Sequence, residues 1–140
     1  MRRAVLISRV SIGALFIAAA LGKALVFNTF AGEIADYELM PIYAVVFIAW
    51  LVLIVEAVIG ALLLKNIRVD IVSCFGIILM VVFLAVKLLA LSMGLEACDV
   101  CFGTLLILPT WAIFALNIGI IITFIILIME DTKCCGKLQS

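Results

Sequence analysis

The stretch EACDVCFG, residues 96–103, contains the two side chains best suited to redox chemistry. Cys98 and Cys101 are separated by two residues, a spacing that allows both sulfurs to meet within one turn of chain. Such a pair closes as a disulfide, exchanges with the thiols of a partner, or supplies half of a four-cysteine metal site. Negative charge on the adjacent Glu96 and Asp99 disfavours the thiolate form. The pair is therefore better suited to a resting disulfide or an electron donor than to a fast nucleophile.

Charged residues inside long apolar stretches are the second group with a chemical role. Glu56 lies near the middle of one stretch, and Arg9, Lys23 and Lys87 lie nearer the ends of others. A lone charge at the centre of a membrane costs at least about 2.5–3.5 kcal/mol. Glu56 is therefore expected to face the interior, paired or protonated, with Arg9 as its expected neighbour. Glu56 is expected either to hold helices in register or to handle protons or quinone. Lys23 and Lys87 are expected either to lie near Glu56 or to extend their ammonium groups toward water.

The composition identifies the environment of these groups. Of 140 residues, 69% are apolar and 13% are charged, whereas about half of a soluble domain is apolar; the mean hydropathy is +1.52. Nine basic and nine acidic residues cancel, so there is no basic excess for a nucleic-acid partner. The sequence has no histidine, which excludes the commonest general base and mixed cysteine and histidine zinc sites. We therefore predict an integral membrane protein.

Four stretches are long enough to cross a bilayer, for which about 20 mostly apolar residues are needed. Because they are continuously apolar and do not alternate, they predict helices and not strands of a barrel. The expected fold is an all-α, integral membrane four-helix bundle, in one domain over residues 1–140. The predicted spans are 4–27, 41–64, 71–93 and 105–129.

The distribution of Lys and Arg predicts the orientation of the bundle. With four spans both termini share a side, and the basic residues outside the apolar centres fall on that side. The positive-inside rule then places both termini in the cytoplasm. The loop with Cys98 and Cys101 faces the periplasm, across the inner (plasma) membrane, where disulfides persist. That side offers only these two thiols and no histidine, so no metal site is expected there.

The remaining cysteines carry weaker signals. Cys74 is expected to be a small apolar residue at a helix end. Cys134 and Cys135 fall on the reducing side and are interpreted as two free thiols on a disordered tail.

The N-terminal residues also resemble a signal peptide with a cleavage site after Gly22. The apolar run resumes after Lys23, however, which favours a retained membrane span. Short connections make neighbouring helices antiparallel, and small residues such as Gly13 and Gly60 are expected to let them approach closely.

Several short motifs occur together in an order typical of one family. They are a basic residue opening the first span, GK near its end (Gly22 and Lys23), YELMP before the second span (Tyr37 to Pro41), EAVIGALLL (with Glu56 and Gly60), and CDVCFG before the last. In this order and spacing the chain resembles the MauE family of methylamine-utilisation membrane proteins, within the wider DoxX-like four-helix proteins. The family usually has a single glycine between the two cysteines, where this chain has Asp99 and Val100.

The resemblance implies an inner-membrane protein of periplasmic redox maturation. The family is associated with disulfide formation in the small subunit of methylamine dehydrogenase, and DoxX-like relatives are linked to quinone-dependent oxidation. As an enzyme, the chain would be a thiol-disulfide or quinone-linked oxidoreductase component, with Cys98 and Cys101 as the catalytic residues and a membrane quinone as the cofactor. Its partners would be the lipid bilayer, a periplasmic thioredoxin-like or client protein, and, as a homo-oligomer, a second copy of itself.

Two alternatives from other functional classes stay open. One is a non-catalytic assembly or scaffold subunit, in which the bond between Cys98 and Cys101 only locks the outer loop. The other is a small solute or ion transporter built around Glu56, although four helices with few charges give a narrow and mostly dry interior.

Overall fold

The fold is entirely helical over the part of the chain that the computed structural model describes, which is residues 2–36, 41–94 and 110–136. Continuous apolar segments form helices in a bilayer because the lipid offers no partner for backbone N–H and C=O groups. The helices are α1 (Arg2–Leu25), α2 (Phe27–Asp36), α3 (Ile42–Leu64), α4 (Val69–Ser92) and α5 (Thr110–Gly136).

Four of these helices, α1, α3, α4 and α5, are long and apolar enough to cross a membrane. They confirm the predicted all-α bundle with four spans. The ends of α3 and α4 lie within two residues of the predicted bounds. The same holds for α1, which begins at Arg2 instead of residue 4 and ends at Leu25 instead of residue 27. α5 continues as helix to Gly136, so the backbone at Cys134 and Cys135 is helical and the predicted disordered tail is wrong there.

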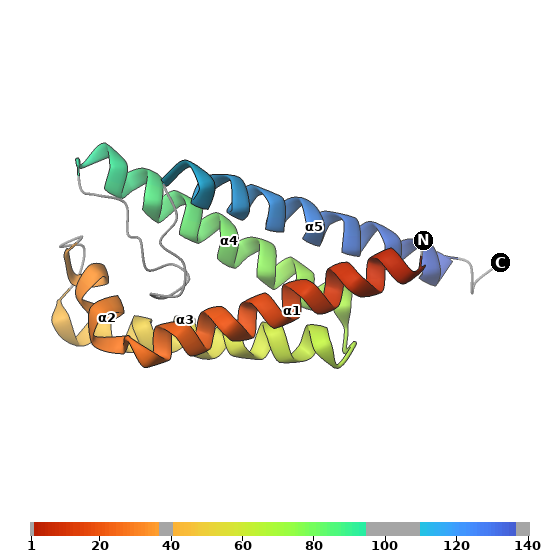
Figure 1. Cartoon of the computed structure of the whole chain (residues 1–140), viewed down its shortest axis with the longest axis horizontal. Helices are drawn as coiled ribbons and strands as arrows, with labels where there is room; N and C mark the ends of the chain where they lie inside the picture. The colour runs from red at the N-terminus through yellow and green to blue at the C-terminus, as the bar shows by residue number, and fades with distance from the viewer. Residues whose placement is uncertain (1, 37–40, 95–109, 137–140) are drawn as a thin grey trace.

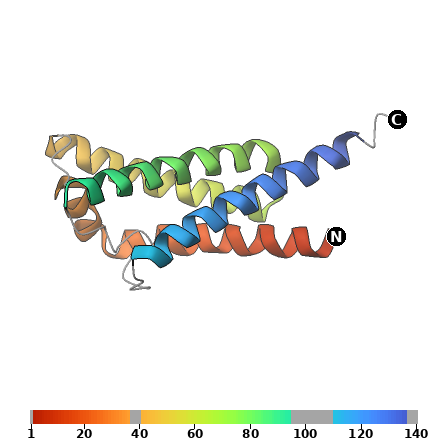
Figure 2. The same ribbon diagram turned by 90° about the horizontal axis from the view of Figure 1, so that it is seen from above.

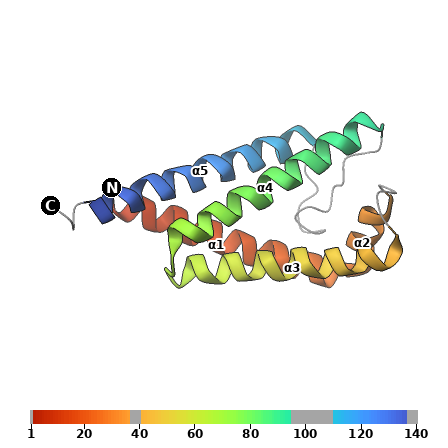
Figure 3. The same cartoon turned by 180° about the vertical axis from the view of Figure 1, so that it is seen from behind.

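The spans form two antiparallel pairs. α1 packs along α3 and α4 packs along α5, and each pair is in much closer contact than the two pairs are with one another. Both termini lie at one end of the bundle, which we call the terminus end, and α2 lies at the other, the α2 end (Figures 1 and 3). In the view from above, α5 is inclined to α1 (Figure 2).

Glycines permit the closest helix contact in the first pair. A Cβ atom added to Gly60 of α3 would lie 2.8 Å from the carbonyl oxygen of Gly13 on α1, and one added to Gly13 would lie 3.1 Å from the carbonyl oxygen of Gly60. This is the close approach that the small residues predicted, and it supplies the packing that holds helices together in lipid. In the second pair, Gly76 of α4 receives the ring of Phe124 from α5.

The apolar core lies toward the terminus end, where the two pairs meet. Phe16 and Phe124 pack edge to face there, with ring centroids 5.7 Å apart. The outward faces of the spans are also apolar, which is expected for helices surrounded by lipid. Large side chains exposed on these faces include Leu21, Phe47, Trp50, Phe75, Leu88 and Trp111.

α2 is an element that the sequence analysis did not predict, because residues 28–40 were expected to be a water-facing connection. Its apolar face packs on α3: the rings of Phe27 and Trp50 are 4.8 Å apart, and Phe30 is buried beside Ala49. The polar side chains of this helix, at positions 28, 29, 33 and 36, recur with the spacing of a short amphipathic helix. α2 therefore covers the first helix pair at the end opposite the termini.

Candidate functional site

A buried ion pair joins the two helices of the first pair. The Lys23 ammonium on α1 lies 2.5 Å from Oε1 of Glu56 on α3, and the two residues are only 1% and 2% exposed. The prediction that Glu56 faces the interior with a partner is confirmed. Its partner is Lys23, and the expected neighbour Arg9 is wrong: Arg9 donates from Nη1 to the Asn66 side chain in the turn between α3 and α4.

The direction of the side chains explains why Lys23 turns inward. Along a helix each Cα–Cβ bond tilts toward the N-terminus. For Lys23 on α1 this direction leads away from the nearer membrane surface and into the bundle, and for Glu56 on the antiparallel α3 it leads toward Lys23. The snorkelling alternative for Lys23 therefore does not describe this structure.

Two aromatic rings complete the surroundings of the Lys23 ammonium. Its Nζ lies 5.4 Å from the ring centre of Phe30 on α2 and 4.9 Å from that of Phe83 on α4. Cations within about 6 Å of a ring face are attracted by the ring quadrupole, most strongly where water is excluded. Phe83 thus links this ion pair, which lies within the first helix pair, to the second helix pair.

The second helix pair contributes two further buried polar groups. Lys87 of α4 is 2% exposed and Asn117 of α5 is 3% exposed. Among the described residues, neither Lys87 Nζ nor Asn117 Nδ2 has a hydrogen-bond partner, and Glu56 Oε2 has none either. Because Lys87 is almost fully enclosed, its side chain does not snorkel to water. The sequence analysis missed Asn117, although it is the one amide inside the last apolar stretch.

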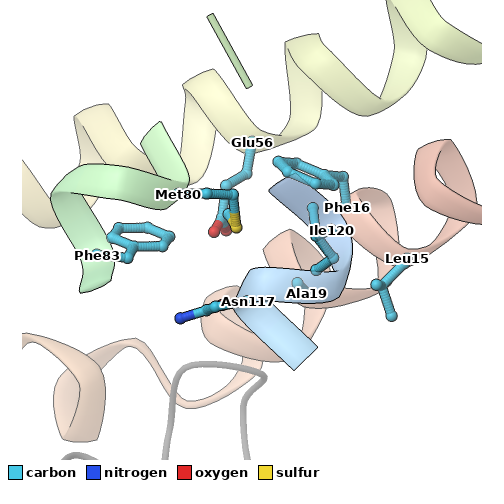
Figure 4. Close-up of a pocket in the computed structure, with 8 residues that line it drawn as sticks. All are labelled: Leu15, Phe16, Ala19, Glu56, Met80, Phe83, Asn117 and Ile120. Atoms are coloured by element: carbon cyan, nitrogen blue, oxygen red, sulfur yellow. The ribbon is translucent and has the colours of Figure 1, made fainter. Parts of the chain in front are cut away.

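Two of the buried polar residues, Glu56 and Asn117, line a small cavity (Figure 4). Its volume is about 10 Å³, which is about the space required for one water molecule. The rest of the lining is apolar and consists of Leu15, Phe16, Ala19, Met80, Phe83 and Ile120. An apolar wall of this kind strengthens any electrostatic interaction inside it.

We call Lys23, Glu56, Lys87 and Asn117 the polar cluster. Each comes from a different membrane-spanning helix, α1, α3, α4 and α5 in turn. The arrangement combines one satisfied ion pair with two unused donors and one unused acceptor. It can therefore hold helices in register and bind a small polar or charged group between the pairs.

The predicted redox residues Cys98 and Cys101 lie outside the described residues. The segment that contains them follows α4 and precedes α5 in the sequence. Lys87 is five residues before Ser92, the last of α4, or about 7.5 Å along the helix. Asn117 is seven residues after Thr110, the first of α5, or about 10.5 Å. Lys87 and Asn117 thus lie within two helical turns of the helix ends that flank this segment.

Comparison with known proteins decides the family. The model of the family described as "Methylamine utilisation protein MauE" matches residues 1–130. The chain belongs to the MauE family. No curated protein and no solved structure gives a significant match. MauE membership and the four apolar spans together identify a multi-pass membrane protein of methylamine utilisation, which confirms the family resemblance seen in the motifs.

Proposed function

We propose that this MauE-family chain supports disulfide formation in a periplasmic client, such as the small subunit of methylamine dehydrogenase. Cys98 and Cys101 are the exchanging pair, on the periplasmic side of the inner membrane. The observation that carries the proposal is the family match over residues 1–130. The excess of Lys and Arg at the terminus end supports the orientation, because basic residues mark the cytoplasmic side.

The proposed reaction is a thiol-disulfide exchange. A client thiolate attacks one sulfur of the disulfide between Cys98 and Cys101, which forms a mixed disulfide and releases the other cysteine. The second client thiolate then attacks the client sulfur of the mixed disulfide, which closes the client disulfide and releases the remaining cysteine. The client loses two electrons and its two thiol protons, and the cysteine pair gains both. A membrane quinone or a partner protein then takes two electrons and two protons to restore the disulfide.

Cysteine substitutions test this proposal in cells that express the client. Cys98→Ser and Cys101→Ser should each abolish client oxidation, measured by trapping free client thiols with an alkylating reagent. Cys74→Ser is the matched control, because Cys74 is a free, exposed cysteine on α4 and should leave the client oxidised. Normal client oxidation in both loop variants would refute the exchange and favour the scaffold alternative.

The orientation has its own test. A membrane-impermeant maleimide, added to intact spheroplasts after reductant, should label the cysteines at positions 98 and 101 in a variant that lacks the other three. Labelling only after the membrane is broken would place this loop in the cytoplasm. Protection without reductant would show that the pair rests as a disulfide.

A further inference from the structure

Two residues that line the same cavity each have a buried polar atom without a hydrogen-bond partner. They are Glu56 of α3 and Asn117 of α5 (Figure 4), which are 2% and 3% exposed. Within the described part of the chain, neither Glu56 Oε2 nor Asn117 Nδ2 makes a hydrogen bond. A buried polar atom left in this way destabilises the fold. Because one atom is an acceptor and the other a donor, a single ligand that donates and accepts can satisfy both.

The size of the cavity limits that ligand to one water molecule. Its volume of about 10 Å³ is about the space that one water requires. A water molecule has two O–H donors and two acceptor lone pairs, so it can donate to a carboxylate oxygen and accept from an amide at the same time. Two polar partners are enough to hold a buried water in place.

The charge beside the cavity favours a neutral ligand over an ion. The Glu56 carboxylate repels anions. It needs no bound cation either, because the Lys23 ammonium lies 2.5 Å from Oε1 and balances its charge. Apart from Glu56 and Asn117 the lining side chains are apolar, so they supply no oxygen ligands for a metal ion. Inside such walls a hydrogen bond from water to the charged oxygen is strong.

From these observations we propose that the cavity is a binding site for one water molecule, which donates to Glu56 Oε2 and accepts from Asn117 Nδ2. The water joins α3 of the first helix pair to α5 of the second. The two pairs contact one another much less than the helices within each pair do, so a polar bridge between them helps to fix how they pack. It also holds the Glu56 carboxylate in the orientation that presents Oε1 to Lys23.

NMR of the full chain in lipid nanodiscs tests the site directly. The chain has three asparagines, Asn28, Asn66 and Asn117, so labelling asparagine with ¹⁵N gives few side-chain signals. The Nδ2 protons of Asn117 should show cross-relaxation with water, with the sign of a long-lived bound molecule. Asn28 and Asn66 are exposed and should show only exchange with bulk water. An Asn117 signal that is visible but has no such water contact would overturn the proposal.

Filling the cavity gives a second test, because the sign of the effect depends on what the cavity holds. Ala19 lines it, and Ala19→Val places two methyl groups where the water would lie. Displacing the water leaves Glu56 Oε2 and Asn117 Nδ2 unpaired, so the melting temperature should fall by roughly 3–10 °C. The control Ala115→Val changes an exposed residue of α5 and should shift it by less than about 2 °C. A rise with Ala19→Val, as expected for a filled dry cavity, or a change no larger than the control, would overturn the proposal.

A double-mutant cycle separates loss of the water from simple overpacking. In an Asn117→Leu background one partner of the water is already gone, so Ala19→Val should lower the melting temperature by less than it does in the parent. An equal loss in both backgrounds would show overpacking and overturn the bridge. If these variants do not fold, Asn28→Asp and Asn66→Gly assign the Asn117 signals by elimination, and the NMR test needs only the parent. None of these readouts depends on client oxidation, so this proposal and the proposed function fail independently.

Discussion

Breaking the ion pair between Lys23 and Glu56 tests the central feature of the structure. Glu56→Leu leaves the Lys23 ammonium enclosed between two phenylalanine rings, and Lys23→Met leaves a buried carboxylate. Removal of one partner from a buried pair costs about 3–5 kcal/mol. We expect each single variant to lose about this much stability. The double variant Lys23→Met with Glu56→Leu removes both charges and should recover most of the loss, because apolar replacement of a whole buried pair is often neutral or stabilising.

The assay is thermal or denaturant unfolding of purified protein in nanodiscs, analysed as a double-mutant cycle. Lys65→Met is the control, since Lys65 is exposed and its loss should change stability by less than about 0.5 kcal/mol. A Lys23→Met variant as stable as this control would refute the buried pair. So would a double variant whose loss equals the sum of the two singles.

Two further predictions concern helix contacts. Gly60→Ala should destabilise the protein by about 1–3 kcal/mol in the same unfolding assay, because the added Cβ meets the carbonyl of Gly13. The control Gly32→Ala should not destabilise the protein, because its added Cβ meets nothing within 4 Å. Equal effects of the two variants would contradict the close approach. Asn66→Ala removes the hydrogen-bond acceptor of Arg9 and a residue type that tolerates the positive φ of 59° at this position. It should therefore lower the stability by about 1–2 kcal/mol. Asn66→Gly should lower the stability less, and the reverse order would count against backbone strain.

The membrane environment, the four spans and the family were all predictable from the amino-acid sequence. Each of these depends on local properties of the chain. Twenty continuous apolar residues must form a helix in lipid wherever their neighbours lie. The same locality explains why the bounds of α3 and α4 were predicted within two residues. The close approach at Gly13 and Gly60 was also visible, since glycine is the residue that permits backbones to meet.

Which polar groups meet depends on how the helices pack against one another, and the sequence did not predict it. Lys23 and Glu56 are 33 residues apart, and their contact depends on the rotation of α1 and the register of α3, which hydropathy does not encode. Arg9 lies in the same span as Lys23 and was an equally good partner by composition. Asn117 on α5 and Glu56 on α3 line one cavity, and this depends on how the second helix pair packs on the first. The depth of a side chain in the membrane follows from its position along one helix, whereas its hydrogen-bond partner depends on how two helices pack.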